Sequence, residues 1–260
     1  MFKYIIISII GSITNLLPIS YSTHIYIYQN LFNTKIFENT YLINTIYLSI
    51  PISILLTYKK DILNNLLLPI KSLIKKDKTK YKKQISNQNI FLITCILSTL
   101  ITYFIPKFNK SLKTIPIYLF ILSIIILLSI NKNGSKKQND LSLKDSFIFS
   151  LSHILNSIPT ISPLCSNLLI SKYLNFNKSL SIKYSLLTLL PIYLIKSISS
   201  INYLLLNTNY IPYYLLSILI STIINLKIIN YLKDIYYNNK FYKLSIYCLL
   251  LGIFLLYWFR

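Results

Sequence analysis

Two breaks decide the fold of this chain: Asn15-Leu16-Leu17-Pro18-Ile19-Ser20-Tyr21-Ser22-Thr23-His24 and His153-Ile154-Leu155-Asn156-Ser157-Ile158-Pro159-Thr160-Ile161-Ser162. Each places proline and polar side chains inside an apolar segment, and both contain the pattern Asn-x-x-Pro. Polar groups at membrane depth are costly, so they tend to mark functional sites. Broken segments at corresponding places in two halves predict inverted repeats that meet at a central cavity.

The apolar segments around these breaks predict an integral membrane protein. Mean hydropathy is +0.56 over 260 residues, and stretches of about 17 or more apolar residues are long enough to cross a bilayer. We expect an all-α fold with about eight transmembrane segments. They are placed at 4–20, 41–57, 90–106, 114–130, 146–170, 184–204, 211–231 and 244–259. The shorter stretch 62–70 ends at Pro69 and reads as interfacial, and 4–20 reads as a retained segment without a cleavage site.

Charge and composition narrow the class further. The net charge is +21, and the lysines gather in two loops, 58–89 and 131–144. Cytoplasmic loops carry such an excess and attract anionic membrane lipids, so we place both loops on the cytoplasmic side and expect no nucleic acid. The chain has no Ala and no Val, which is the imprint of an AT-rich genome. Cys95, Cys165 and Cys248 are isolated, so neither zinc nor disulfides are expected.

The order of the breaks predicts one polytopic membrane domain made of two repeats, with halves near 1–130 and 144–260. Pro51 follows Pro18 by 33 residues, and Pro191 follows Pro159 by 32 residues. A proline within a span removes a backbone hydrogen bond and kinks the helix. The freed backbone groups need protein or water partners at that depth. We therefore expect broken or re-entrant helices around Pro18 and Pro159.

The residues that follow Pro18 suggest phosphate chemistry. Ser20, Ser22 and Thr23 offer hydroxyls, and His24 offers an imidazole within the same short segment. Hydroxyls and exposed backbone N–H groups hold phosphate, and a histidine acts as an acid, base or nucleophile. The alternative is an ordinary polar loop just outside the membrane.

Here the sequence resembles a known family. The first break is similar to the signature Glu-Gly-x-x-Glu-Phe-x-Pro-[Ile/Val]-Ser-Ser-[Ser/Thr]-Gly-His of the bacterial undecaprenyl-diphosphate phosphatases, the bacitracin-resistance family. The second break resembles that family's Pro-Gly-x-Ser-Arg-Ser-Gly-x-Thr signature. The matching residues are Pro18, Ile19, Ser20, Ser22, His24, Pro159 and Ser162. Further resemblance at 48–62 and 175–191 extends the match over nearly the whole chain.

The resemblance implies an activity and a site. The protein would hydrolyse undecaprenyl diphosphate to the monophosphate at the outer face of the bacterial inner (plasma) membrane, which recycles the carrier for cell-wall synthesis. His24 and Ser20 would be catalytic, whereas Asn15, Ser22 and Ser162 would hold phosphate oxygens. The metal would be Mg²⁺ or Ca²⁺, and the partner a polyprenyl (di)phosphate lipid.

The departures from the family fall on this chemistry. Its two signature glutamates correspond to Gly11 and Asn15, its second serine to Tyr21 and its arginine to Pro163. No acidic residue lies within a predicted span, and the one arginine is Arg260. A buried diphosphate needs compensating cations, which a metal or a bidentate arginine would supply.

The nearest candidate cations in the sequence are Lys172 and Lys178, both expected at a span end. Loss of a single positioned charged group typically costs about a hundredfold in rate or more. We therefore expect reduced or lost activity. His153 and Asn156 face the same break, either as substrate contacts or as a hydrogen bond between helices.

Two alternatives stay open beside the phosphatase. A non-catalytic polyprenyl-phosphate binder or transporter would use the same fold, since inverted repeats with broken helices suit alternating access. A decaying gene product in a reduced genome would yield little stable protein. The sequence leaves the oligomeric state open.

Overall fold

The fold is all-helical in the part of the chain that the structure describes. The computed structural model describes residues 2–32, 40–74, 78–130, 132, 134–206 and 211–259. The elements are α1 (Phe2–Leu16), α2 (Tyr21–Phe32), α3 (Thr40–Ile74), α4 (Lys78–Phe104), α5 (Thr114–Leu128), η2 (Gln138–Asp140), α6 (Leu143–Leu151), η3 (Ser152–Ser157), α7 (Pro163–Tyr173), α8 (Lys178–Leu187), α9 (Leu189–Leu206), α10 (Ile211–Tyr237) and α11 (Tyr242–Trp258). Within these ranges the extended pairing is limited to one isolated bridge between Lys136 and Phe176.

Several of these helices have the length and apolar surface of membrane spans. In the described ranges, Ile85–Phe104, Lys178–Ile198 and Ile211–Tyr237 are long and apolar enough to cross a bilayer. Three shorter apolar helices, Ile5–Leu16, Thr114–Leu128 and Tyr242–Trp258, accompany them. Large apolar side chains on their outer faces are exposed, as expected where lipid replaces water. The predicted all-α membrane fold is confirmed.

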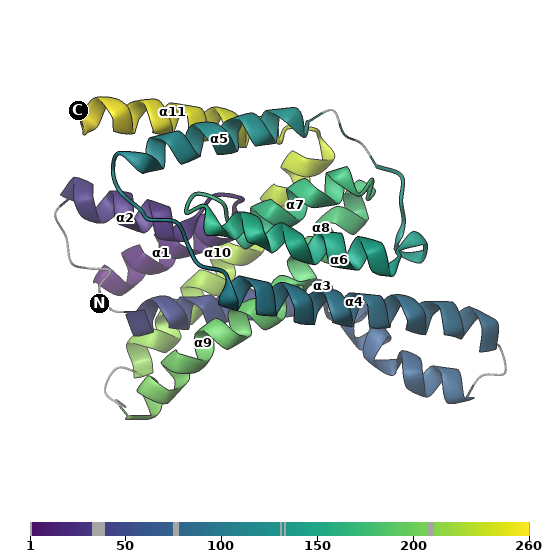
Figure 1. The fold of residues 1–260 in the computed structure, drawn as a ribbon. Helices are drawn as coiled ribbons and strands as arrows, with labels where there is room; N and C mark the ends of the chain where they lie inside the picture. The colour runs from purple at the N-terminus through teal and green to yellow at the C-terminus, as the bar shows by residue number, and fades with distance from the viewer. Residues whose placement is uncertain are drawn as a thin grey trace.

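Each break is the tip of a helical hairpin. The helix α1 ends at Leu16 and α2 returns from Tyr21, because Pro18 has no N–H to continue the ladder. The second hairpin runs through α6 and η3, turns at 158–162, and returns as α7. Ser162 caps α7 by accepting a hydrogen bond from the Cys165 backbone N–H, with Pro163 at the first helical position. The two hairpins approach each other from opposite ends of the molecule (Figure 1).

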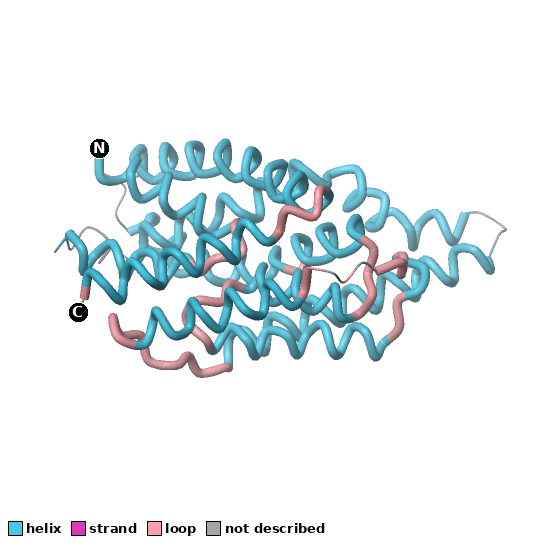
Figure 2. The backbone as a smooth tube through the Cα atoms, turned by 90° about the horizontal axis from the view of Figure 1, so that it is seen from above, coloured by secondary structure: helices cyan, strands magenta, loops and turns pink. Residues whose placement is uncertain are grey.

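The remaining helices pack in a matching order in the two halves. The contact between α1 and α10 corresponds to the contact between α6 and α4. In the same way, the contact between α3 and α10 corresponds to the contact between α9 and α4. The pairs α3–α9 and α5–α11 join equivalent positions of the halves. Most helices run along one common direction (Figure 2). This order is what the predicted repeat requires.

Serine takes the place of small apolar residues at the helix contacts. The chain lacks alanine and has three glycines, yet close helix packing in membranes needs small side chains. Ser12 and Ser53 are fully buried and donate to the carbonyls four residues earlier, at 2.6 and 2.7 Å. Across the α5–α11 contact, Ser123 and Ser245 lie 2.8 Å apart at their hydroxyls. The hydroxyls are thereby satisfied without water.

Four expectations differ from the structure. The basic loop 58–89 is largely helical, because α3 continues to Ile74 and α4 begins at Lys78, so 62–70 belongs to α3. The span 146–170 is divided into α6, η3 and α7 rather than continuous. The non-helical residue in α3 is Tyr58 and not Pro51, since neighbouring helices accommodate a proline within a bundle. The span 184–204 is interrupted at Thr188, just before Pro191.

The two basic segments lie at the same end of the molecule. The C-terminal end of α3, the N-terminal end of α4 and the described residues between α5 and α6 are found together at this end (Figure 1). The segment 105–113, between α4 and α5, lies away from it. This arrangement agrees with the expectation that both basic segments share one side of the membrane.

Candidate functional site

The two breaks are in direct contact. The hydroxyl of Thr23, in α2, donates a hydrogen bond of 2.6 Å to the carbonyl oxygen of Pro159. Thr23 is fully buried. A hydrogen bond between residues 136 positions apart therefore fixes the first break against the second. The predicted meeting of the breaks at the centre of the fold is confirmed by this contact.

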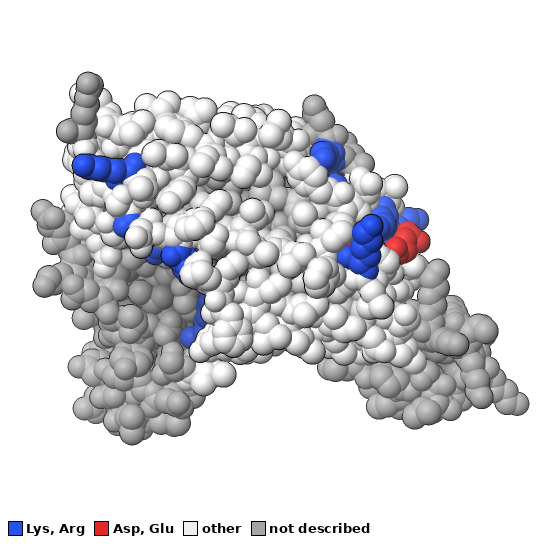
Figure 3. All heavy atoms as spheres, viewed as in Figure 1, with Lys and Arg blue, Asp and Glu red and all other residues white. Residues whose placement is uncertain are grey.

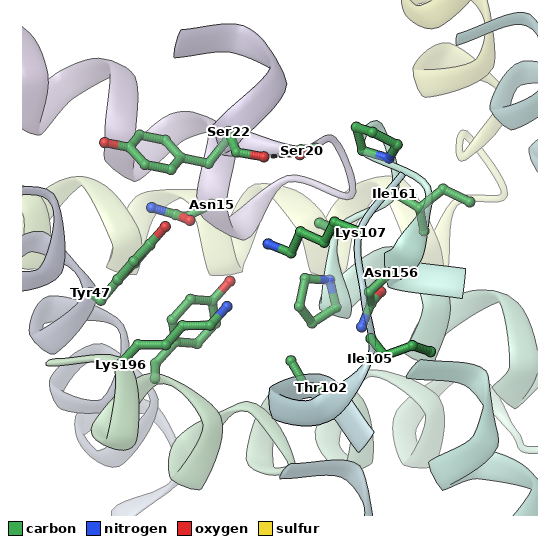
Figure 4. A pocket seen from close by; sticks show the side chains of 15 residues that line it. Asn15, Ser20, Ser22, Tyr47, Thr102, Ile105, Lys107, Asn156, Ile161 and Lys196 are labelled. Carbon is green, nitrogen blue, oxygen red and sulfur yellow. Dashed lines mark hydrogen bonds between the residues drawn. The ribbon is translucent and has the colours of Figure 1, made fainter. Parts of the chain in front are cut away.

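A pocket of about 50 Å³ opens where the breaks meet. This is room for a few water-sized groups. Its polar lining comes from both hairpins, α3, α4, α9 and the segment after α4 (Figure 4). The residues with a polar side chain are Asn15, Ser20, Tyr21, Ser22, Tyr47, Thr102, Lys107, Asn156, Ser162, Tyr193 and Lys196.

Two buried amides face this pocket with unused hydrogen-bonding atoms. Asn15 is 3% exposed, and its Nδ2 has no partner in the structure. Asn156 is 5% exposed, and its Oδ1 has none, although its Nδ2 lies 3.1 Å from Nδ1 of His153. Buried polar atoms are nearly always paired. Unpaired amide atoms that line a pocket therefore indicate a place for a polar ligand or water.

Two lysines supply the charge of the pocket. Lys107 comes from the segment after α4 and Lys196 from the middle of α9, and both point toward the centre of the cavity (Figure 4). The Lys196 ammonium lies 5.6 and 5.2 Å from the ring centres of Tyr47 and Tyr193. These distances are typical of cation–π contacts. Desolvation by the surrounding protein lowers the pKa of Lys107 below its usual value.

No acidic residue lines the pocket beside these lysines. The two ion pairs seen in the described parts of the chain lie elsewhere, between Lys136 and Asp145 and between Lys183 and Asp61. The pocket therefore has a positive charge that no lining carboxylate compensates. It suits an anion.

The cations expected near the site lie elsewhere. Lys172 donates to the carbonyl of Ser129 at 3.0 Å, and Lys178 donates to the carbonyl of Tyr237 at 2.9 Å. Both line a separate small pocket and not the one between the breaks. The expectation that they are the nearest cations was wrong, because α7 and α8 carry these positions away from the tip of the second hairpin.

His24 is held away from the pocket. Its Nδ1 lies 2.7 Å from the carbonyl oxygen of Ser20, and its Nε2 lies 2.7 Å from the Tyr247 hydroxyl of α11. Since a carbonyl only accepts, Nδ1 carries the proton and the neutral ring accepts from Tyr247 through Nε2. The two rings are also stacked, 5.8 Å apart at their centres. Both nitrogens are therefore engaged: Nδ1 holds the ring against the start of α2, and Nε2 joins α2 to α11.

The three predicted serines do line the pocket. Ser20 and Ser22 lie 3.1 Å apart at their hydroxyls, and Ser162, the cap of α7, lines the same pocket. The pocket therefore lies at the N-terminal ends of α2 and α7. Helix N-termini carry partial positive charge and favour bound anions. Of the sequence-predicted site residues, Asn15, Ser20, Ser22 and Ser162 are brought together, whereas His24 is placed beside them.

A divalent metal does not fit this set of residues. Mg²⁺ and Ca²⁺ need oxygen ligands, with carboxylates foremost. The residues that line the pocket include no carboxylate, and the two lysines among them repel a cation. In the portions of the chain with described structure, no group of three or more His, Cys, Asp or Glu residues is close enough to hold a metal ion. The expected Mg²⁺ or Ca²⁺ therefore has no evident ligands here.

The pocket continues into an apolar groove between α4 and α9. A neighbouring cavity of about 400 Å³ shares Thr102, Lys107 and Lys196 with the polar pocket. A further cavity of about 490 Å³ shares Thr99 and Ile195 with that neighbour and is lined mainly by apolar residues. The three cavities form one path from a charged end to an apolar end.

Charged side chains on the surface also gather at particular places. On the face shown in Figure 3, basic side chains gather at the end that holds the α5–α6 connection. A second group of basic side chains follows the segment between α4 and α5 into a hollow. The second group leads toward the pocket, whereas the described surface between the two groups carries no charged side chains in this view (Figure 3).

The sequence contains a signal for Lys196, although no role was predicted for this residue. An ionisable residue within a membrane span marks a functional site by default, and Lys196 lies inside the predicted span 184–204. Lys107 has no comparable signal, because a lysine in a short connecting loop is common. Only the folded chain shows that the two share a pocket.

Comparisons with known proteins agree with this architecture. The family model described as "Bacitracin resistance protein BacA" matches residues 4–254. "Undecaprenyl-diphosphatase 1" of Bacillus cereus is 27% identical, with 96% of this chain and 95% of the relative covered. "Undecaprenyl-diphosphatase 2" of Halalkalibacterium halodurans is 29% identical, with 98% and 95% covered. "Undecaprenyl-diphosphatase" of Thermosipho melanesiensis is 25% identical, with 96% of each covered.

Proposed function

The chain belongs to the bacitracin resistance protein BacA family, and from this premise we propose that it binds a polyprenyl diphosphate at the pocket between the breaks. We further propose that it hydrolyses the lipid far more slowly than its named relatives, or not at all. The observation that carries the proposal is the positive, hydroxyl-lined pocket that continues into an apolar groove. The first part suits a diphosphate and the second an isoprenoid chain.

The polar end supports recognition of a phosphorylated headgroup. Ser20, Ser22 and Ser162 offer hydroxyls around a small cavity, and Asn15 adds an unused amide. Two helix N-termini and two lysines favour negative charge at the same place. A soluble phosphate would use this end alone. The adjoining cavities of about 400 and 490 Å³ support a lipid-linked one.

The groups needed for rapid hydrolysis are not present in the lining. A general base must lie within hydrogen-bond reach of the nucleophile's proton, yet the lining holds no carboxylate and no imidazole. His24 is the nearest base in sequence, and its acceptor nitrogen is occupied by Tyr247. Loss of one positioned charged group costs about a hundredfold or more in rate. The expected activity is correspondingly low.

The test is phosphate release from undecaprenyl diphosphate by the purified full-length protein, measured beside the Bacillus cereus relative. Reactions would contain Mg²⁺ or EDTA, and would include the variants His24→Ala and Tyr247→Phe. We expect the relative to release phosphate at least about a hundredfold faster. Comparable metal-dependent release by this chain, abolished in His24→Ala, would overturn the low-activity proposal. Tyr247→Phe controls for the loss of the α2–α11 contact.

A second candidate function is binding or transport without chemistry. The pair Lys107 and Lys196 favours it, because two protonated lysines hold an anion and have no lone pair with which to act as a base. This candidate predicts saturable binding of undecaprenyl diphosphate in the complete absence of phosphate release. Absence of binding by folded protein would rule out both candidates.

A further inference from the structure

The charge balance of the pocket leads to a more specific inference, which rests on the proposed function. We propose that Lys107 and Lys196 together replace a divalent metal, so that this protein binds a diphosphate headgroup without any metal ion. The two lysines are the cationic residues among those that line the pocket. The inference therefore concerns residues of this chain that the family resemblance does not assign.

The first support is the sign of the charge. A dication held by two carboxylates brings no net charge to a headgroup. Here Gly11 and Asn15, at the positions that the resemblance assigns to glutamates, are both uncharged. The two lysines then bring two positive charges with no lining acid to cancel them. The uncharged residues at positions 11 and 15 and the two lysines are thus consistent with one another, because a carboxylate beside these lysines would neutralise them.

The second support is that the two lysines share one cavity. Their side chains come from different segments and both point into it (Figure 4). Two like charges at a protein–lipid boundary are costly unless an opposite charge lies between them. A diphosphate has oxygens for both lysines at once. Its binding would convert the repulsion into attraction.

The third support is the way Lys196 is held. Its ammonium lies within 5.6 Å of the ring centres of Tyr47 and Tyr193. Tyr193 is itself 2% exposed, so the aromatic wall is fixed by packing. Contact with aromatic faces stabilises the cation while the pocket is empty of ligand. It also directs the ammonium toward the cavity.

The fourth support is a hydrogen-bond donor without a partner beside the lysines. Asn15 is almost completely buried, and its Nδ2 lacks an acceptor in the structure. A phosphate oxygen between the lysines would satisfy this donor. An amide donates to the anion where a glutamate at the same position would repel it. The neutral side chain therefore suits direct binding of the anion.

The experiment measures binding by the full-length protein in nanodiscs. The probes are undecaprenyl diphosphate and inorganic diphosphate, each tested with EDTA and with Mg²⁺. The variants are Lys107→Met, Lys196→Met and the charge-retaining Lys196→Arg. Lys144→Met, at an exposed lysine away from the pocket, serves as the matched control. Thermal unfolding of every variant reports whether it has folded.

We expect EDTA to leave the affinity of the wild type for both probes within about twofold. Each pocket methionine variant should weaken binding by about tenfold or more, the usual effect of losing a hydrogen bond to a charged group. Lys196→Arg should retain most of the binding, and Lys144→Met all of it. Loss of binding in the folded Lys196→Met protein but not in Lys196→Arg would identify charge as the cause.

Three distinct results would contradict the inference, the proposed function, or both. Lipid binding that requires Mg²⁺ and ignores both lysines would overturn the metal-free site but leave the proposed function intact. Lysine-dependent binding of inorganic diphosphate without binding of the lipid would retain the anion site and overturn the lipid function. Binding of neither probe by folded protein would overturn both.

Discussion

The contact between Gly11 and Tyr21 gives a quantitative prediction about how the site departed from its family. Gly11 is buried in α1, and a Cβ atom placed on it lies 3.3 Å from both Ile46 Cγ2 and Tyr21 Cε2. Favourable carbon–carbon contacts lie near 3.5–4.0 Å. Any side chain at position 11 must therefore displace its neighbours. Substitutions at positions 11 and 21 are therefore expected to be energetically coupled.

The expected cost follows from overpacking. Gly11→Ala should lower the free energy of unfolding by about 1–3 kcal/mol, as for extra methyl groups in a packed interior. That is about a 5- to 150-fold change in the folding equilibrium. Tyr21→Ser removes one of the two contacting groups, so the cost of Gly11→Ala should fall by roughly half in that background. Contacting residues commonly show coupling of about 0.5–3 kcal/mol.

The assay is a double-mutant cycle. The wild type, both single variants and the double variant would be unfolded reversibly in mixed micelles, and circular dichroism would confirm that each begins with native helix content. Coupling of at least about 0.5 kcal/mol between positions 11 and 21 is expected. Additive effects of the two substitutions would refute the reasoning. Coupling would mean that a larger side chain at position 11 is less destabilising once Tyr21 has been replaced.

Three further predictions concern other parts of the fold. Asp145→Asn should lower the free energy of unfolding by about 1–3 kcal/mol at neutral pH, because it removes hydrogen bonds to a charged group. Burial by itself raises the pKa of Asp145. The hydrogen bonds from Lys136 and from the helix cap outweigh this effect and hold the pKa below its usual value. The advantage of the wild type should be complete above pH about 4 and disappear as pH falls through the lower folded pKa; a constant difference down to pH about 2 would contradict it. Gly134→Ala should destabilise the α5–α6 connection, because its Cβ would meet the backbone of Asn175, and native-like hydrogen exchange in this segment would argue against that clash. Thr23→Val should cost about 1–3 kcal/mol in micelle unfolding and weaken diphosphate binding, because it leaves a buried carbonyl unpaired at the second break; equal unfolding curves would show that the breaks do not depend on this bond.

The sequence was sufficient for the features that depend on local chemistry. Apolar length predicts membrane helices, and Pro18 and Pro159 predict broken ones, because proline removes a backbone donor wherever it lies. The breaks fall where predicted, and Thr23 joins them. Prediction was weaker where packing competes with local preference. Pro51 lies inside α3 without interrupting it, whereas Tyr58 does interrupt it.

What the sequence by itself determined is the class of protein, its helical hairpins and four of the five predicted site residues in the pocket. Only the tertiary structure decided that the charges of Lys107 and Lys196 reach that pocket and that the imidazole of His24 does not. Lys107, in the segment after α4, and Lys196, in α9, are 89 positions apart and share one pocket through the packing of α4 against α9. His24 is held by Tyr247, which is 223 positions away. The physical reason is that backbone preferences act between near neighbours in the chain, whereas electrostatic and hydrogen-bond partners are selected by the packing of distant segments.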